Sequence, residues 1–181
     1  MEKNFIIAGF GGQGVLLAGE VLATAFMRAN KNVTWYPSYG AEMRGGTVNC
    51  EIVASDNEVS SVNKLNADFI VALNQASFDK FLSKIKKGGW MIANSTLAKE
   101  IKTRADINYI FAPMTKLAEE LGNVKMANIL ALGILAKASK IISLEHLSQA
   151  LDSVLPTHRK HLLPLNLKAL KIGYEYDLLP V

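Results

Sequence analysis

The sequence NFIIAGFGGQG, residues 4–14, is the strongest indication of the fold. Its apolar run Phe5–Ala8 contains two β-branched residues, which is typical of a short buried strand. Four glycines follow between residues 9 and 14. Because glycine tolerates positive φ and lets other groups approach the backbone closely, these glycines predict a tight turn with exposed amides.

A helix is predicted directly after this turn, because apolar residues recur there at helical spacing: Val15, Ala18, Leu22, Ala25, Phe26 and Ala29. A strand, a glycine turn and a helix N-terminus together form a potential anion site, since unpaired N–H groups and the positive end of the helix dipole point the same way. The candidate residues of this site are Gly9, Gly11, Gly12, Gln13 and Gly14. The alternative is that the turn serves only tight packing of the helix on the strand.

Residues 9–14 also match the dinucleotide fingerprint G-x-G-x-x-G, a short pattern that needs its structural context. An acidic residue that holds a ribose hydroxyl is expected about 20 residues further on. The second strand, predicted at 33–36, provides none, and the first acid, Glu42, lies inside the following loop. The pattern therefore favours the fold and argues against a stand-alone NAD-dependent oxidoreductase.

The composition predicts one globular domain over residues 1–181, because half of the residues are hydrophobic and the chain is long enough for a substantial core. The net charge of +4 is mild, and the lysine clusters at 80–87 and 99–102 lack interleaved aromatic residues, so we expect no nucleic acid partner. No apolar run reaches the ~18 residues of a membrane span. The N-terminus enters a strand almost at once, unlike a signal peptide, so a cytoplasmic location is expected.

The single cysteine, Cys50, excludes an internal disulfide and any iron–sulfur cluster held by several thiolates of this chain. It shares one side of the alternating segment 46–54 with Val48 and Ile52, which predicts a small core residue in a half-buried strand. We expect that strand to be antiparallel or to lie at the edge of the sheet. His158 and His161 lie in a basic run without further ligands, so a solvated face is expected there and no metal site.

Strands and helices alternate along the middle of the chain. Strands are predicted at 68–73, 90–93 and 107–112, with a helix at 78–85 that closes at Lys86–Gly89. This order predicts an α/β fold: an open, Rossmann-like, mostly parallel twisted sheet with helices on both faces. Ligands on such sheets bind beyond the carboxyl ends of the strands. Those ends carry Gly9–Gly14, Ser38–Gly46, Asn74-Gln75, Asn94-Ser95 and residues 113–115.

The last third of the chain is predicted to be helical, over 126–136, 144–155 and 158–173 with Pro164 in the path of the last helix. The segment 126–136 is apolar nearly all round, with Asn128 as the polar exception. Such a helix is buried on every side. In a small domain this indicates that a partner chain covers one face, and hence a dimer.

The glycine turn at 9–15 and the loop YGAEMRGG at 39–46, in this order and spacing, resemble the gamma subunit of the 2-oxoacid:ferredoxin oxidoreductases. The form of the loop is most similar to the 2-oxoglutarate branch. The pyruvate and ketoisovalerate branches are less similar, and the small subunit of the indolepyruvate enzyme matches residues 39–46 more poorly. The resemblance covers essentially the whole chain.

This resemblance implies a multi-subunit enzyme with alpha, beta and delta-type partner subunits. Such an enzyme decarboxylates a 2-oxoacid on thiamine diphosphate and Mg, passes electrons through iron–sulfur clusters to ferredoxin, and transfers the acyl group to coenzyme A. This chain has one cysteine and no Gly-Asp-Gly followed by paired asparagines, the diphosphate–magnesium signature. We therefore expect it to bind none of these cofactors, to hold no catalytic residue and to be inert alone.

Two kinds of contribution remain for the chain in such a complex. One is coenzyme A binding by the glycine turn or by Arg44, whose guanidinium suits phosphate. The other is a subunit interface or a mouth of the active site, for which the candidates are Tyr39, Glu42, Met43, Gly45, Gly46 and Asn128. The alternatives are that Glu42 pairs with Arg44, that Asn128 is a satisfied buried amide, and that the chain is a purely structural subunit.

Overall fold

The computed structural model describes residues 1–39, 47–59, 66–100 and 102–178. Six strands form one sheet in the order β2-β3-β1-β4-β5-β6. They are β1 (Glu2–Phe10), β2 (Asn32–Tyr39), β3 (Thr47–Ser55), β4 (Ala67–Ala72), β5 (Ile85–Asn94) and β6 (Asn108–Ala112). The pairs β1–β4, β4–β5 and β5–β6 are parallel, while β3 runs antiparallel to both β1 and β2. The predicted mostly parallel α/β sheet is confirmed.

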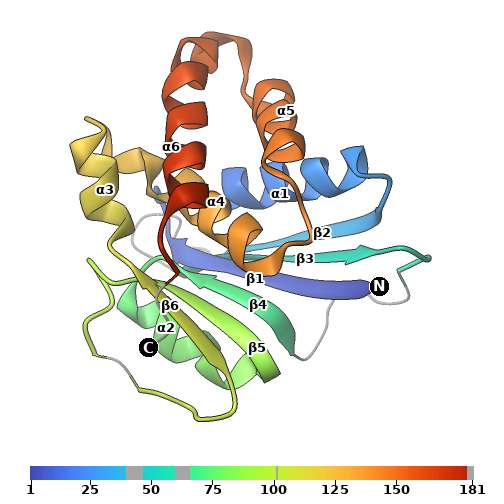
Figure 1. Ribbon diagram of the computed structural model, residues 1–181, viewed down its shortest axis with the longest axis vertical. Helices are drawn as coiled ribbons and strands as arrows, with labels where there is room; N and C mark the ends of the chain where they lie inside the picture. The colour runs from blue at the N-terminus through green and yellow to red at the C-terminus, as the bar shows by residue number, and fades with distance from the viewer. Residues whose placement is uncertain (40–46, 60–65, 101, 179–181) are drawn as a thin grey trace.

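The helices are α1 (Val15–Arg28), α2 (Gln75–Phe81), α3 (Met114–Glu120), α4 (Ala127–Ser139), α5 (Leu144–Val154) and α6 (Leu163–Glu175), with short 3-10 turns η1 (Leu82–Lys84), η2 (Val124–Met126) and η3 (Thr157–Leu162). The helices α1, α4, α5 and α6 lie together on one face of the sheet, and α2 lies on the other (Figure 1). Side chains that alternate along β1 divide between the two cores: Phe5 and Ile7 face α1, and Ile6 and Ala8 face α2. None of the helices in the described part of the chain is long and apolar enough to cross a membrane.

The strand β3 corrects one sequence prediction. It is antiparallel as expected, but it lies between β1 and β2, so β2 is the edge strand. Both of its faces are buried, including Asn49 and Glu51, so it is not half-buried. Alternation of residue types predicted the strand but not its neighbours, because strand order depends on contacts between distant segments.

The segment that follows α2 corrects a second prediction. The helix ends at Phe81 instead of continuing to residue 85, and Lys86–Gly89 belong to β5. The register of β5 against β4 shifts between Ala67 and Phe69, so the two strands pair irregularly there. The glycines therefore accommodate an irregular strand start and do not close a helix.

The helix α4 is buried on every side, as predicted, but its own chain buries it. Residues 128–136 are all buried within this single chain, between the sheet and the helices α1, α3 and α6. Gly133 allows the close approach of α6, because a Cβ there would lie 2.6 Å from the backbone nitrogen of Tyr174. The argument that a partner chain must cover this helix is therefore wrong. The burial of α4 no longer supports the prediction of a dimer.

The predicted last helix, 158–173, is divided in two. Residues 157–162 form η3, and α6 begins only at Leu163, with Pro164 in its first turn. Proline is tolerated at this position because the first N–H groups of a helix have no partner inside it.

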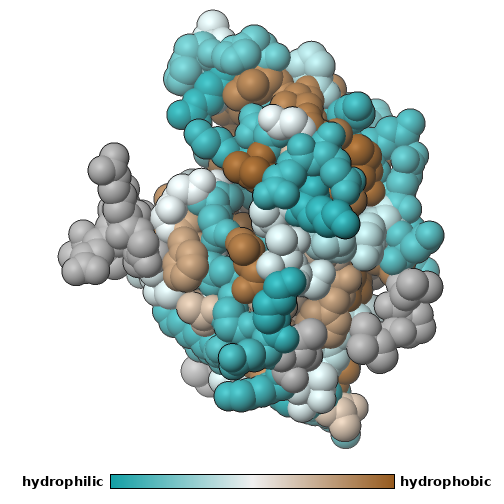
Figure 2. All heavy atoms as spheres, turned by 90° about the vertical axis from the view of Figure 1, so that its left-hand side faces the viewer, coloured by the Kyte–Doolittle hydropathy of each residue, from teal (hydrophilic) through white to brown (hydrophobic). Residues whose placement is uncertain are grey.

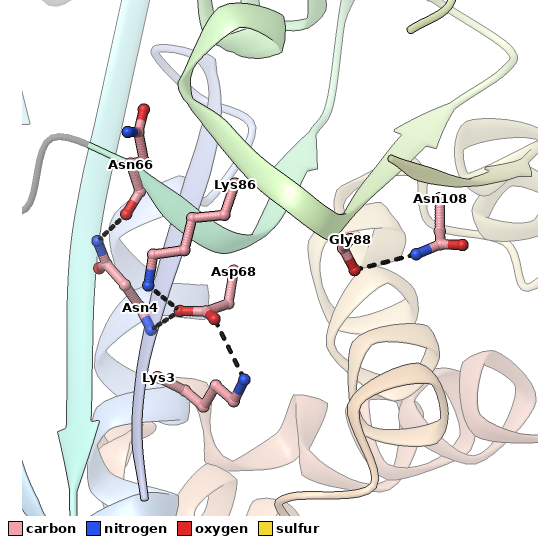
Figure 3. A network of polar contacts seen from close by, with 7 residues as sticks. All are labelled: Lys3, Asn4, Asn66, Asp68, Lys86, Gly88 and Asn108. Carbon is pink, nitrogen blue, oxygen red and sulfur yellow. Dashed lines mark hydrogen bonds and ion pairs between the residues drawn. The ribbon is translucent and has the colours of Figure 1, made fainter. Parts of the chain in front are cut away.

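A polar network ties the first residues of the parallel strands together (Figure 3). Asp68, at the start of β4, accepts a hydrogen bond from Asn4 N at 2.9 Å and pairs with Lys86 at 2.7 Å and Lys3 at 3.2 Å. Burial raises the pKa of the Asp68 carboxyl, but these three donors together outweigh it and hold the pKa below its usual value. The network thus stabilises the amino edge of the sheet, opposite the glycine turn.

Candidate functional site

The glycine turn has the predicted strand–turn–helix geometry. It joins Phe10, the last residue of β1, to Val15, the first of α1. Gly14 precedes the helix with φ of 72°, a left-handed conformation that L side chains rarely adopt, and a Cβ there would collide with Asn128 Nδ2. No side chain in the described part of the chain caps the first N–H groups of α1. These groups are the donors of a potential anion site.

Gln13 braces this turn from inside the protein. Its Oε1 accepts hydrogen bonds from Phe10 N at 2.6 Å and from Asn74 Nδ2 at 2.8 Å, and its Nε2 donates to Leu73 O at 3.4 Å. These bonds join the end of β1 to the end of β4. The side chain of Gln13 therefore holds the turn in place, and its backbone N–H is also used within the turn, where it donates to Phe10 O at 3.1 Å.

Three other polar residues at the carboxyl edge of the sheet, Asn74, Asn94 and Gln75, are also occupied by the chain itself. Asn74 Oδ1 caps α2 by accepting from Ser77 N at 2.9 Å. Asn94 donates to Leu73 O and to Thr115 Oγ1, and its Oδ1 accepts from Thr115 N at 3.2 Å. Gln75 accepts from two backbone N–H groups of residues 99 and 100. These three residues therefore have structural roles at this edge of the sheet.

A cavity of about 530 Å³ lies against the glycine turn. Residues from the first turns of α1, α4 and α6 all contribute to its lining, and the uncapped N-terminus of α1 places the positive end of that helix dipole beside it. The described residues that line it are Phe10, Gly11, Gly12, Gly14, Val15, Leu16, Leu17, Val48, Asn123, Lys125, Met126, Asn128, Leu155, Arg159, Leu162 and Asn166. Figure 2 shows, from the side of α3, apolar side chains in the upper part of the molecule beside a recess in the surface.

The charges around this cavity favour an anion. Lys125 and Arg159 are exposed and line it, and the described lining residues include no aspartate or glutamate. The remaining wall is largely apolar, with Phe10, Leu155 and Leu162 among its residues. The arrangement therefore suits a ligand with an anionic end and an apolar body.

Asn128 is one of two buried asparagines that line the cavity, with 2% of its surface exposed. Its Nδ2 donates to Gly14 O at 2.9 Å, which joins α4 to the glycine turn across 114 positions of sequence. Its Oδ1 is buried and has no hydrogen-bond partner among the described residues. An unsatisfied buried acceptor of this kind costs about 1–3 kcal/mol. The alternative of a fully satisfied buried amide therefore holds only for the nitrogen of Asn128, since its Oδ1 has no partner among the described residues.

Cys50 lies behind the cavity wall, in the core. Its Sγ is 3.6 Å from Val15 O, and the residue is fully buried, as predicted. Burial raises the pKa of this thiol to about 12, so it is protonated and inert at neutral pH.

The structure brings together four of the candidates from the sequence, Gly11, Gly12, Gly14 and Asn128, in one cavity. Gly9 lies beneath the turn, where a Cβ would be 2.7 Å from Gln13 Oε1. Glu42, Met43, Arg44, Gly45 and Gly46, and the side chain of Tyr39, lie outside the described residues.

Sequence reasoning missed two basic residues of the cavity, Lys125 and Arg159. Lys125 is next to the apolar segment 126–136, which was an available signal. Arg159 lies in the run 158–161, which we interpreted as a solvated face.

Comparisons with known proteins agree with this architecture. The family model "Pyruvate ferredoxin/flavodoxin oxidoreductase" matches residues 4–176. The 2-oxoglutarate synthase subunit KorC of Methanocaldococcus jannaschii is 35% identical over 180 residues, covering 97% of this chain and 94% of that protein. The ketoisovalerate oxidoreductase subunit VorA of Methanothermobacter marburgensis is 35% identical over 97% of this chain, which spans 36% of that protein.

Among solved structures, the gamma subunit of a keto/oxoacid ferredoxin oxidoreductase from Geobacter sulfurreducens PCA has a TM-score of 0.85 at 29% identity. The alignment covers 97% of this chain and 95% of that one. The resemblance that residues 9–15 and 39–46 indicated is confirmed: the chain belongs to the pyruvate ferredoxin/flavodoxin oxidoreductase family and is of its gamma-subunit type.

Proposed function

We propose that this chain is the gamma subunit of a multi-subunit 2-oxoglutarate:ferredoxin oxidoreductase and forms part of its coenzyme A channel. The cavity at the glycine turn is the observation that carries this proposal. Its described lining holds two cations and no carboxylate, and it includes the uncapped first turn of α1. Coenzyme A combines phosphates with a long, uncharged arm, and so has the anionic end and extended body that such a lining suits.

In this proposal the chain binds and orients the acyl acceptor and does no redox chemistry. Thiamine diphosphate, Mg and iron–sulfur clusters belong to alpha, beta and delta-type partner subunits and supply the decarboxylation and electron transfer to ferredoxin. The N–H groups of α1 and the ammonium and guanidinium groups of Lys125 and Arg159 hold the phosphates. We propose Arg44 as a further phosphate ligand, and residues 39–46 with Asn128 as the mouth of the channel. A cytoplasmic location fits such a complex.

Two alternatives compete with this proposal. The chain could serve the pyruvate, ketoisovalerate or indolepyruvate variant of the enzyme, or act only as a structural subunit. A stand-alone nucleotide-binding protein is disfavoured, since β2 carries no acid that could hold a ribose hydroxyl.

Co-purification from the native host tests the assignment. We expect partners with a thiamine diphosphate motif and with ferredoxin-like cysteine spacings, and an assembly that converts 2-oxoglutarate with coenzyme A. The chain alone should turn over no 2-oxoacid and contain neither thiamine nor iron. Tightly bound NAD or flavin in the purified chain would contradict the assignment.

Arg44→Ala in the assembled enzyme tests the coenzyme A role. We expect a higher KM for coenzyme A, because the loss of a charge-assisted phosphate contact weakens binding by about tenfold. Thiamine-dependent decarboxylation measured without coenzyme A should stay unchanged. An unaltered KM for coenzyme A would remove Arg44 from this role.

A further inference from the structure

The amide of Asn128 has only one orientation that its surroundings allow. One of its two terminal atoms faces Gly14 O at 2.9 Å, and Gly14 O also accepts a hydrogen bond from Ala18 N at 3.0 Å. A carbonyl oxygen accepts and cannot donate. The atom of Asn128 that faces it must therefore be the nitrogen, so the carbonyl oxygen Oδ1 is directed away from Gly14.

This oxygen lacks a donor although it is buried. Asn128 lines the cavity with 2% of its surface exposed, and no described residue donates to its Oδ1. Buried acceptors without a donor are rare in native proteins. Since Oδ1 can only accept, the missing partner is an N–H or O–H group from outside this part of the chain.

The second buried asparagine of the cavity shows that this is not a general property of its wall. Asn166 is also 2% exposed, and its Nδ2 donates to Leu162 O at 2.8 Å within the first turn of α6. No atom of Asn166 is buried without a partner. Among the described lining residues, Asn128 is therefore the one with a buried acceptor that lacks a donor.

We propose that Asn128 determines ligand specificity by accepting a hydrogen bond from an amide N–H of the pantetheine arm, while Lys125 and Arg159 hold the phosphates. This rests on the proposed function, because it takes coenzyme A as the ligand. The phosphates lie toward the exposed cations, and the arm extends past the apolar wall to the base of α4. Phosphate alone is then insufficient for full affinity, because the arm is recognised through its own donor.

Calorimetric titration of the full chain separates the two contributions, with coenzyme A, pantetheine and the adenosine bisphosphate half of coenzyme A as probes. Asn128→Leu should weaken coenzyme A and pantetheine by about fivefold to tenfold and leave the nucleotide half unchanged, because one hydrogen bond is lost. The double variant Lys125→Ala with Arg159→Ala should weaken coenzyme A and its nucleotide half and leave the binding of pantetheine unchanged. Asn4→Leu is the matched control, and we expect it to preserve the wild-type binding of all three probes, because Asn4 is equally buried and also has an unpartnered Oδ1 but lies outside the cavity lining.

A pantetheine in which an ester replaces each amide in turn tests the same bond on the unmodified protein, so the result does not depend on the stability of Asn128→Leu. Replacement of the amide that Asn128 contacts should weaken binding to the wild-type chain and to Asn4→Leu by the same factor. It should have no effect on Asn128→Leu, since the two changes remove one interaction.

The outcomes distinguish this inference from the proposed function. If coenzyme A binds but no ester analogue is weakened, or if Asn128→Leu weakens the nucleotide half equally, the role of Asn128 is overturned and the coenzyme A channel stands. If pantetheine binds through Asn128 but the cavity variants leave the KM for coenzyme A of the assembled enzyme unchanged, the binding role of Asn128 is supported and the proposal of a coenzyme A channel is rejected. A wild-type chain that binds none of the three probes contradicts both.

Discussion

The contact between α4 and α6 gives the sharpest prediction for stability, through Gly133→Ala. In an ordinary helix this change is favourable by about 1 kcal/mol, because alanine has the higher helix propensity. Here the added Cβ would lie 2.6 Å from Tyr174 N and 2.9 Å from the carbonyl carbon of Gly173, and would collide with Leu170 O. These are backbone atoms that cannot rotate away, so the two helices must separate.

Overpacking of a tight core contact costs about 1–3 kcal/mol, and contact with backbone puts this case at the upper end. After the gain in propensity, we expect a net loss of about 2 kcal/mol in the free energy of unfolding. For a chain of this size the melting temperature should fall by about 4–8 °C.

Thermal unfolding followed by circular dichroism measures this loss, with urea unfolding as an independent check. Lys168→Ala is the control, because it places alanine on the exposed side of α6 without touching the contact. A Gly133→Ala variant that melts at or above the wild-type temperature would show that the helices do not approach as closely as described.

Two further predictions concern titratable groups. Cys50 should resist iodoacetamide at pH 8 in the native chain and react in urea, because burial raises the pKa of its thiol to about 12. Between the unfolded pKa of 9.0 and the folded pKa of about 12, only the unfolded state loses the thiol proton. The stability advantage of wild type over Cys50→Ala should therefore fall by about 1 kcal/mol per pH unit above pH 9. A difference in stability that stays constant with pH would contradict the raised pKa. Asp68→Asn should cost about 1 kcal/mol of unfolding free energy at pH 7, since its partners Lys3 and Lys86 are partly exposed and solvent screens the ion pairs. Because the pKa of Asp68 in the folded state lies below its usual value of 3.8, this cost should shrink as the pH falls below 3.8 and the folded-state carboxylate becomes protonated, as measured by urea unfolding; a cost that persists in strong acid would assign the effect to packing.

Most of the local structure could be predicted from the sequence. The strand, turn and helix over residues 2–28 follow from a β-branched apolar run, glycines and helical periodicity, all of which act between near neighbours. The burial of α4 all round was equally visible from its composition. Its cause was not, because composition cannot tell whether the same chain or another one provides the covering surface.

The candidate site could be predicted in part. Gly11, Gly12 and Gly14 were found because a turn between strand and helix has a recognisable pattern. Lys125 and Arg159 were not, since a basic residue has no local sign of the cavity that it will line. Gln13 was predicted as an anion ligand, but its side chain is engaged by Phe10, Leu73 and Asn74.

Short-range patterns were therefore enough to predict the α/β class and the glycine turn, and the motifs at 9–15 and 39–46 carried the family resemblance. The insertion of β3 between β1 and β2, and the meeting of Asn128 with Gly14 across 114 positions, depend on the packed chain. The physical reason is that a residue pattern specifies which surface an element buries, whereas its partner depends on the free energy of the whole arrangement. The Oδ1 atom of Asn128 has no donor among the described residues, and this could not be predicted from its neighbours in the sequence.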